Sequence, residues 1–335
     1  MREIQITAND AGRRLDRFLR KYMRNASLGE IYKIIRKDVK IDGKRRNESY
    51  MLQEGEVLTL YVSDEALDKL TGGTSEAVRP ARKAKRQFGI VFEDECVLIA
   101  DKPFGLLTHG DINEKKNHLA NQVKDYLIEK GEYGPRSEKV FSPAPANRID
   151  RNTTGLVLFG KTSAALKELN RIIRDDLVSK YYLTIVCGKI SSEQVLEGTL
   201  VKDTRANKVS IRSSNKASSH GADAGINRST NSVTNRSTSD SSELAIKTIV
   251  RPLEVLKFGK DGKFDATLVE VELVTGRSHQ IRAHLASIGH PIIGDSKYAT
   301  RSARDMNALL LDRFGLSTQL LHAYRLEFAE ELADI

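Results

Sequence analysis

The sequence predicts an α+β protein in which a small basic α/β domain precedes a larger, mostly antiparallel mixed-sheet domain. The chain has 335 residues, more than one domain usually holds. Two helical patterns rich in Lys and Arg stand near the start, and beyond residue 87 short strand-like segments outnumber helical ones. We therefore expect a small domain at 1–62, a flexible basic linker at 63–86 and the larger domain at 87–335.

The first domain begins with two predicted helices. Residues 13–24 form one, because their apolar side chains recur at helical spacing: Leu15, Phe18, Leu19 and Tyr22. The second is expected to start at Ser27, since Ser27 and Glu30 have the spacing of a capping box. Its core face would hold Ile31, Ile34 and Ile35.

A hairpin and a linker follow. Residues 39–44 alternate and turn at Asp42-Gly43, which predicts a hairpin, and residues 57–62 predict a last strand. The linker contains Gly72-Gly73 and a basic arm at 79–86.

The larger domain alternates strands with two helices. The helices are expected at 117–130 and from Ser163, which would cap the second. Seven strands are expected, at 90–94, 97–100, 181–186, 199–202, 208–212, 246–250 and 267–273. Residues 213–242 are rich in Ser, Thr, Asn and Gly, which predicts a disordered insertion without chemistry.

Composition excludes several classes of protein. The formal charge of +9 favours a polyanionic partner. Cys96 and Cys187 lie in apolar runs without a Cys-x-x-Cys spacing, so neither a disulfide framework nor a zinc site is expected, and both thiols should be buried. The amino terminus lacks a signal-peptide pattern, and no apolar run has the length of a membrane span. We expect a cytoplasmic protein.

Two clusters of polar residues carry the chemistry. The first reads A-N-R-I-D-R-N-T-T-G at 146–155 and places Asp150 between Arg148 and Arg151. The second reads T-G-R-S-H-Q-I-R-A-H-L at 275–285. Alone, a carboxylate between two arginines is as readily a solvated salt-bridge cluster as a functional site.

Together the clusters resemble the RluA family of RNA pseudouridine synthases, whose motifs read H-R-L-D-x-x-T-S-G and G-R-T-H-Q-I-R-x-H-L. The resemblance covers roughly residues 86–328. It implies a curved mixed sheet with an active-site cleft along its middle, and chemistry that needs no metal and no cofactor. The family's catalytic Asp falls on Asp150, its active-site Tyr on Tyr182 of the K-Y-Y-L segment, and its active-site Arg on Arg282.

The resemblance also implies a role for each residue. A working Asp must be ionised in a pocket that excludes water, and Arg282 would counter the rise in pKa that desolvation causes. Arg148 would fill the space that a flipped nucleotide vacates, and Tyr182 would stack on the uracil. Arg151 and Arg277 are further candidates for substrate contacts. Whether the carboxylate attacks the base or the sugar, or removes a sugar proton, stays open.

The first domain resembles the alpha-L (S-four type) RNA-binding domain over residues 14–19, 34–37 and 39–43. The resemblance implies that it grips structured RNA through phosphates and shape, with Arg36 and Lys37 among the contacts. The alternative to RNA binding is that the basic side chains of the two helices are simply exposed to solvent.

Three departures from the family pattern stand out: Asn147 replaces His, Thr154 replaces Ser, and Asp101 replaces the Asn of an N-K-P motif. All three replacements keep hydrogen-bonding groups. They are therefore expected to change which substrate is recognised more than whether the enzyme is active. The histidines in and just after the second cluster fit no standard ligand set, and neutral structural roles are expected for His279, His284 and His290.

We therefore expect an RNA pseudouridine synthase that acts as a monomer on structured RNA. Large-subunit ribosomal RNA, naked or within an assembling particle, is favoured over tRNA. A non-catalytic RNA-binding or ribosome-assembly factor on the same fold is the alternative, although the presence of Asp150, Tyr182 and Arg282 argues against it. A glycoside or nucleoside hydrolase would need a second carboxylate, and none stands near either motif.

Overall fold

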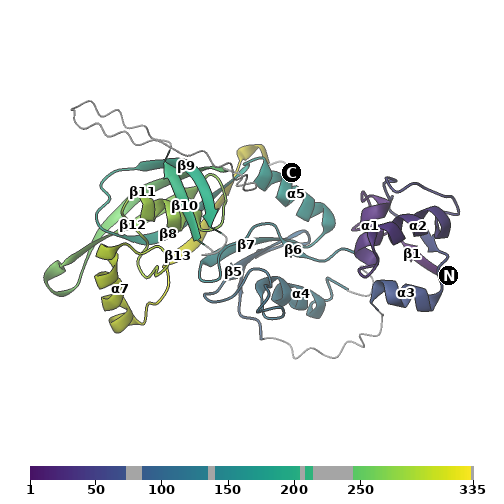
Figure 1. Ribbon diagram of the computed structural model, residues 1–335, viewed down its shortest axis with the longest axis horizontal. Helices are drawn as coiled ribbons and strands as arrows, with labels where there is room; N and C mark the ends of the chain where they lie inside the picture. Colours follow the sequence, from purple (N-terminus) through teal and green to yellow (C-terminus); the bar gives the residue numbers. More distant parts are fainter. Residues whose placement is uncertain (73–84, 135–139, 204–207, 214–243, 333–335) are drawn as a thin grey trace, which may run out of the picture. The chain divides into compact units, whose positions relative to one another are not determined.

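The computed structural model describes residues 1–72, 85–134, 140–203, 208–213 and 244–332 (Figure 1). The chain divides into two compact units, Met1–Leu177 and Val178–Ile335, and each is described by itself. The predicted insertion at 213–242 lies, apart from its first residue, outside the described residues.

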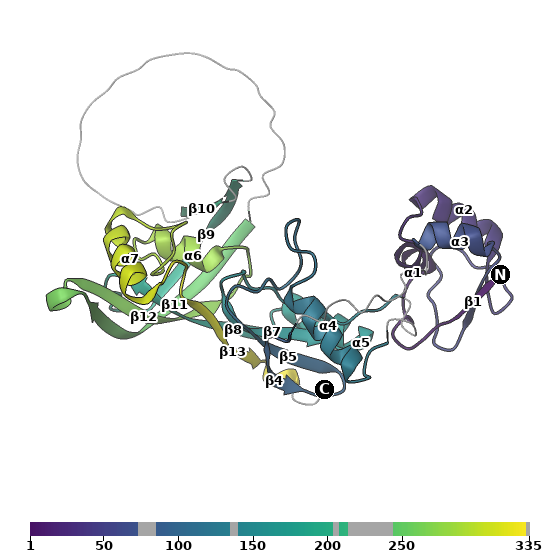
Figure 2. The same ribbon diagram turned by 90° about the horizontal axis from the view of Figure 1, so that it is seen from below.

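The first unit begins with a small α/β module. Its strands form one antiparallel sheet in the order β1-β3-β2. Figure 2 shows α1, α2, α3 and β1 of this module in one cluster. The elements are β1 (Arg2–Gln5), α1 (Leu15–Tyr22), α2 (Leu28–Asp38), β2 (Val39–Ile41), β3 (Val57–Leu60) and α3 (Asp64–Thr71).

The capping box at the start of α2 is confirmed. Ser27 Oγ accepts from the backbone of Glu30, and the Glu30 carboxylate accepts from the backbone of Ser27 at 2.8 Å. The three isoleucines predicted for the core face of α2 are buried. The hairpin prediction is only partly right. Asp42 and Gly43 make the turn with positive φ, but beyond it only Lys44 bridges back to Ile41, and β2 takes β3 as its partner.

The linker prediction is wrong over its first residues, which form α3. Ser63 caps this helix by accepting from Ala66 N, and Gly72 ends it in the left-handed conformation. Leu67 is only 2% exposed and packs into the core of the module. Residues 73–84, which include part of the predicted basic arm, lie outside the described residues.

The rest of the first unit is a small sheet in the order β7-β5-β4, with β6 paired to β7, all antiparallel. Both views place α4 beside β5 (Figures 1 and 2). The elements are β4 (Gly89–Glu93), β5 (Val97–Lys102), α4 (Leu119–Glu129), β6 (Ala144–Pro145), β7 (Thr154–Gly160) and α5 (Ser163–Arg174).

Two local predictions in this part need correction. Thr162, rather than Ser163, caps α5, because its hydroxyl accepts from Ala165 N at 3.1 Å. Cys96 is exposed, whereas Cys187 is buried as expected. Cys96 sits in the tight β4–β5 turn, where its N–H donates to the Asp94 carboxylate, so its apolar neighbours do not carry it into the core.

The second unit is built on an antiparallel sheet in the order β10-β9-β11-β12-β8-β13. All strands predicted here are present, and most are longer than expected. The elements are β8 (Val178–Cys187), β9 (Gln194–Asp203), β10 (Lys208–Ser213), β11 (Leu244–Phe258), β12 (Phe264–Leu273), α6 (Gln280–Ser287), α7 (Arg301–Phe314), β13 (Leu321–Phe328) and the short 3₁₀ turns at Lys260–Gly262 and Glu330–Leu332.

The mostly antiparallel α+β class is thus confirmed. The core of the second unit forms where α7 packs Ala303, Met306 and Leu310 against Cys187 and Ala266 of the sheet. Among the described residues, no helix combines the length and the apolar character that a membrane span requires.

Candidate active site

Asp150 lies in the irregular loop that leads into β7. The segment is not a strand, yet its burial alternates: Ile149 is buried, Asp150 is half-buried and Arg148 is exposed. Arg148 and Asp150 are thus more accessible than Ile149, which lies between them in the core. The backbone N–H of Thr153 donates to the carbonyl of Asp150 at 3.1 Å and closes a turn just after the carboxylate.

Side chains hold the backbone before Asp150. The Thr108 hydroxyl donates to the Ile149 carbonyl at 2.9 Å. Asn147 reaches across to β7, where its Oδ1 accepts from Leu158 N at 2.8 Å. The Asn that replaces the family's His therefore ties the loop to the neighbouring strand, and this explains why an amide suits the position.

Lys102 holds the backbone on the other side of Asp150. Its side chain is fully buried, and its Nζ donates to the carbonyls of Leu106 at 2.7 Å, Arg151 at 2.9 Å and Pro103 at 3.0 Å. Burial lowers the pKa of Lys102 to about 8, while the nearby charge of Asp150 acts to raise it. A buried cation thus fixes the loop of the candidate carboxylate.

Tyr182 lies in β8 of the second unit, between Val271 of β12 and Ala323 of β13. Its side chain is only 6% exposed, and the side chains of these two cross-strand neighbours are buried as well. Because side chains alternate along a strand, the neighbouring Tyr181 faces the opposite side of the sheet. The two tyrosines therefore lie on opposite faces of the sheet in the second unit.

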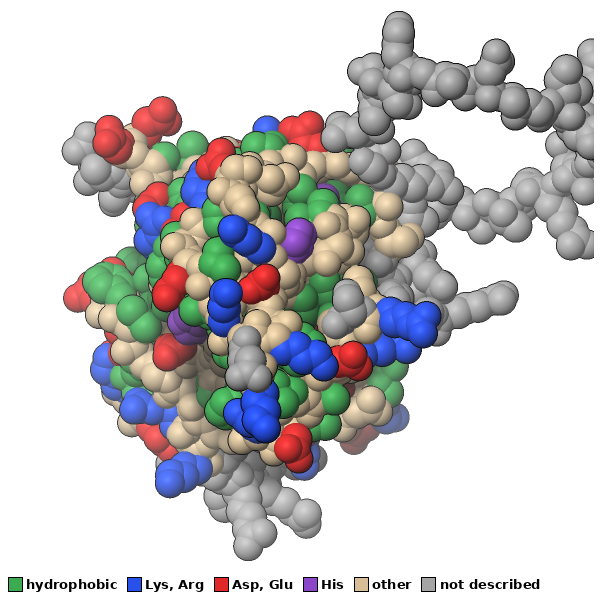
Figure 3. Space-filling view, turned by 90° about the vertical axis from the view of Figure 1, so that its left-hand side faces the viewer, with side chains coloured by type: hydrophobic (Ala, Val, Ile, Leu, Met, Phe, Trp, Pro, Cys, Tyr) green, Lys and Arg blue, Asp and Glu red, His purple; other side chains and the backbone are tan. Residues whose placement is uncertain are grey.

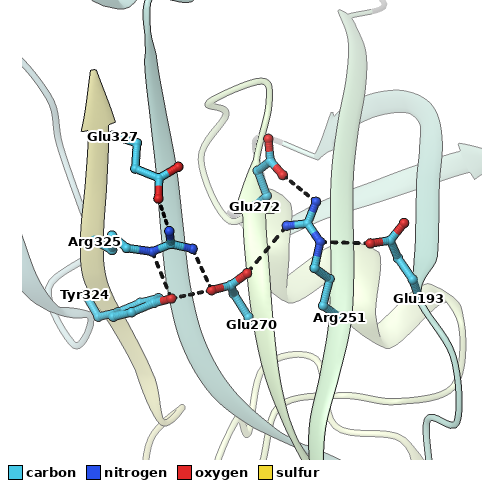
Figure 4. A network of polar contacts seen from close by, with 7 residues as sticks. All are labelled: Glu193, Arg251, Glu270, Glu272, Tyr324, Arg325 and Glu327. Atoms are coloured by element: carbon cyan, nitrogen blue, oxygen red, sulfur yellow. Dashed lines mark hydrogen bonds and ion pairs between the residues drawn. The ribbon is translucent and has the colours of Figure 1, made fainter. Parts of the chain in front are cut away.

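Figure 4 shows a polar network that includes Glu270 and Glu272 of β12. It lies on the Tyr181 side of the sheet, because Glu272 is the cross-strand neighbour of Tyr181. A bulge in β13 turns both Tyr324 and Arg325 toward Glu270, and the Arg325 guanidinium lies 3.9 Å from the centre of the Tyr181 ring. Burial acts to raise the pKa of Glu270, but hydrogen bonds from Tyr324 and Arg325 hold it below its usual value. The network fixes the register of β12, β8 and β13, and with it the side on which Tyr182 stands.

Arg282 lies in α6 and is buried against Asp295. Its Nε donates to Asp295 Oδ2 at 2.7 Å, and a terminal nitrogen donates to Oδ1 at 2.9 Å. The side chains are 9% and 1% exposed, and the Tyr298 ring lies 5.1 Å from the guanidinium. A bidentate pair of this kind fixes the plane of the guanidinium. The carboxylate found on Arg282 in its own unit is thus Asp295, and the predicted pair with Asp150 stays a prediction.

Polar residues on either side of Arg282 tie its helix to β11. Gln280 is buried and donates to Thr248 Oγ1 and to the Lys247 carbonyl, both at 3.0 Å. His284 Nδ1 lies 2.8 Å from the same Thr248 hydroxyl, and burial lowers the pKa of His284 to about 4, which keeps it neutral. Arg277, the other predicted contact in this cluster, is exposed in the preceding turn.

The two remaining histidines are also engaged in structure. His279 Nδ1 lies 3.1 Å from the Tyr298 hydroxyl, and His290 Nδ1 lies 2.8 Å from the Cys187 carbonyl. In the part of the chain that the structure describes, no group of three or more His, Cys, Asp or Glu side chains is arranged to hold a metal ion.

The structure thus brings some candidate residues together. Arg148, Asp150 and Arg151 share one loop of the first unit, while Tyr182 and Arg282 belong to the second. Arg36 and Lys37 are exposed in the last turn of α2, in the small module.

Three supporting residues were missed at the sequence level: Lys102, Thr108 and Asp295. Lys102 and Asp295 stand within segments that match family motifs, and this was the available signal. Nothing in the pattern around Thr108 distinguishes it.

The surface in Figure 3 mixes Lys and Arg with Asp and Glu side chains. This face therefore has no continuous area of positive charge, which would favour the binding of phosphates. In the small module, by contrast, α1 and α2 expose many basic side chains: Arg17, Arg20, Lys21, Lys33, Arg36 and Lys37.

Known proteins resemble this chain over most of its length. A family model described as RNA pseudouridylate synthase matches residues 96–287, more than half of the chain. Ribosomal large subunit pseudouridine synthase C of Vibrio cholerae is 28% identical over 340 residues, which cover 99% of this chain and 90% of the relative. The protein of the same name from Escherichia coli K12 is 28% identical over 332 residues, covering 97% and 88%.

A solved structure also matches. Human RNA pseudouridylate synthase domain containing 4 aligns with a TM-score of 0.51 and 21% identity, over 71% of this chain and 83% of the human chain. At this identity the match supports the fold alone.

Proposed function

The chain belongs to the RNA pseudouridylate synthase family, and from this premise we propose that it converts specific uridines of large-subunit ribosomal RNA to pseudouridine, with Asp150 as the catalytic carboxylate. The curated relatives that align over nearly the whole chain carry the ribosomal name, which supports this RNA. The observation that carries the assignment of Asp150 is the support of its loop from both sides, by Thr108 before the carboxylate and by Lys102 after it.

The reaction requires a carboxylate in a fixed position and no change of oxidation state. The bond between uracil N1 and ribose C1′ breaks, the base turns, and a bond forms between C5 and C1′. C5 loses its hydrogen and N1 gains one, so atoms balance without an oxidant or a reductant. An ionised Asp150 can act as nucleophile or as base in this sequence.

We propose that Tyr182 and Arg282, both in the second unit, also take part in the reaction. Tyr182 would stack on the uracil, and Arg282 would present a guanidinium to the Asp150 carboxylate or to the substrate. Asp295 supports this role because its bidentate contact fixes the guanidinium. Arg148, Arg151 and Arg277 are exposed and would contact the RNA backbone.

We propose that the small amino-terminal module adds affinity for folded RNA, through α1 and α2 with Arg36 and Lys37. Exposed cations at this density bind phosphates without reading sequence. A ribosomal RNA substrate would place the enzyme in the cytoplasm. That the enzyme acts as a monomer stays a prediction. So does its substrate form, a naked transcript or an assembling particle.

Tritium release from uridine labelled at C5 tests the proposal. The substrate is ribosomal RNA from a strain that lacks this gene, so that the target uridines are unmodified. Wild type should release tritium, and Asp150→Asn should release none while it keeps nearly all affinity for RNA. Asp125→Asn in α4 is the matched control and should behave as wild type.

Each other outcome has a definite meaning. Release by Asp150→Asn at the wild-type rate would remove Asp150 from the reaction. Release from tRNA but not from ribosomal RNA would replace the substrate. If neither ribosomal RNA, precursor particles nor tRNA gave release with wild type, a non-catalytic RNA-binding factor would be the correct function.

A further inference from the structure

The loop between β5 and α4 exposes an aromatic ring close to the catalytic segment. Phe104 is 59% exposed, although phenylalanine is usually buried in folded proteins. It follows Lys102 by two residues, and Arg151 of the Asp150 loop bonds to the next residue, Gly105. A single exposed ring indicates nothing by itself, so the case for Phe104 depends on its support and on the cavity beside it.

The backbone that carries Phe104 is held on both sides. Lys102 Nζ bonds to the Pro103 carbonyl at 3.0 Å, and Arg151 Nε bonds to the Gly105 carbonyl at 3.0 Å. Farther along, Leu119 N donates to the Leu107 carbonyl at 2.8 Å. The ring is therefore presented on a fixed support, which lowers the entropic cost of binding to it.

A cavity of about 220 Å³ opens beside this ring, lined by Phe104, Leu106, Gln87, Glu114, Asn117 and Arg151. It is smaller than the pockets of about 300–1,000 Å³ that hold drug-sized ligands. A single ring system with hydrogen-bonding edges fits this size and this largely polar lining.

The polar groups of the lining have fixed directions. Gln122 Nε2 donates to Gln87 Oε1 and to Asn117 Oδ1, both at 2.8 Å, so each amide keeps its NH₂ group for another acceptor. Glu114 Oε1 accepts the backbone N–H groups of Asn117 and Lys116 at 2.7 and 2.9 Å. These bonds lower the pKa of Glu114, so the carboxylate is ionised at neutral pH and Oε2 remains as an acceptor.

We propose that this cavity is a subsite for one unstacked nucleobase of the RNA strand beside the target uridine. The base stacks on Phe104, an amino group on its edge donates to Glu114, and the adjoining phosphate meets Arg151. The inference rests on the proposed function, since it takes the RNA bound at Asp150 as the source of the base.

Three features favour a nucleobase over other ligands. An aromatic face stacks with any base, and RNA loops supply bases that are already splayed out. Amide donors together with a carboxylate acceptor match an edge that both accepts and donates, such as that of cytosine or guanine. Arg151 directly follows Asp150, so a nucleotide held here is a neighbour of the one that reacts.

The test begins with the wild-type enzyme on unmodified ribosomal RNA, to locate the uridine that it converts. A short RNA that contains this uridine then serves as substrate, with kcat and KM measured by tritium release. Phe104→Ala should lower kcat/KM by about 5- to 150-fold, the range for loss of one base–aromatic stack, chiefly through KM. Phe104→Trp should retain wild-type kinetics. Phe314→Ala, at a ring that is 70% exposed in α7, is the matched control.

The same RNA identifies the base. Each nucleotide that flanks the target is replaced in turn by an abasic one. At one position the replacement should impair wild type as much as Phe104→Ala does, and should add nothing in that variant. Glu114→Gln should weaken binding only when the base at this position carries an amino group.

The outcomes separate this proposal from the function on which it rests. No turnover by wild type on any RNA would overturn the function and the subsite together. Normal turnover by wild type and by Phe104→Ala would overturn the subsite alone. Equal losses in Phe104→Ala and Phe104→Trp, or no coupling to any flanking base, would make Phe104 a structural residue and also refute the subsite.

Discussion

Lys102 should make the stability of the protein depend on pH in a way that Lys102→Met does not. The lysine is fully buried, and burial lowers its pKa from 10.5 to about 8 in the folded protein. Between these pH values the unfolded chain binds more protons than the folded one, so the free energy of unfolding rises with pH. The contribution of Lys102 is least favourable below pH 8 and improves as the folded-state amine loses its proton.

The size of the effect follows from the shift. A difference of one pKa unit corresponds to about 1.4 kcal/mol, so the full effect from neutral pH to above 10.5 is about 3 kcal/mol. Between pH 7 and pH 9 only part of this is gained, about 1 kcal/mol. Loss of the three hydrogen bonds to backbone carbonyls also destabilises Lys102→Met, but this offset is the same at every pH.

Urea unfolding of wild type and Lys102→Met, followed by circular dichroism at pH 7, 8 and 9, gives the required difference. Groups that titrate in both proteins cancel when one curve is subtracted from the other. The advantage of wild type over the variant should grow by about 1 kcal/mol from pH 7 to pH 9. A constant or shrinking difference would refute the reasoning and would mean that the amine keeps an ordinary pKa in spite of its burial.

Two other changes test the rest of the site. Asp295→Asn should lower the free energy of unfolding by about 3 kcal/mol, because the buried Arg282 guanidinium loses its charged partner. Unfolding in urea measures this change. Unchanged stability would mean that the ion pair does not anchor Arg282. Arg36→Gln combined with Lys37→Gln should weaken RNA binding and reduce the dependence of log K on log salt by about one to two. Fluorescence anisotropy over a series of salt concentrations gives that slope, and an unchanged value would exclude these side chains from phosphate contact.

The sequence predicted correctly those elements that depend only on residues close together in the chain. The capping box at Ser27 and the helical spacing of Ile31, Ile34 and Ile35 needed no distant partner, and both are present. The cap of α5 was misplaced by one residue, because Thr162 and Ser163 carry equally suitable hydroxyls. The helix at 64–71 was overlooked because most of its residues are polar or charged. Its few apolar side chains, such as Leu67, are buried only once the rest of the module provides a core.

The supports of the site could not be predicted because they join residues far apart in sequence. Lysine is expected on the surface, whereas Lys102 is buried with three carbonyl acceptors, one of which belongs to Arg151, 49 residues later. The sequence likewise offers many carboxylates for Arg282, and only the fold of the loop after α6 selects Asp295. Motif resemblance located the chemistry, whereas tertiary contacts determine what holds it.

One cation connects the candidate carboxylate with the proposed base subsite. Lys102 binds the Pro103 carbonyl beside Phe104 and the Arg151 carbonyl beside Asp150, so both loops depend on the same ammonium group. Lys102→Met should therefore lower kcat and raise KM together, whereas Phe104→Ala should act chiefly on KM. A fall in kcat at unchanged KM in Lys102→Met would show that the lysine supports the carboxylate alone, and that the aromatic ring takes its position from Arg151 and the rest of its own loop.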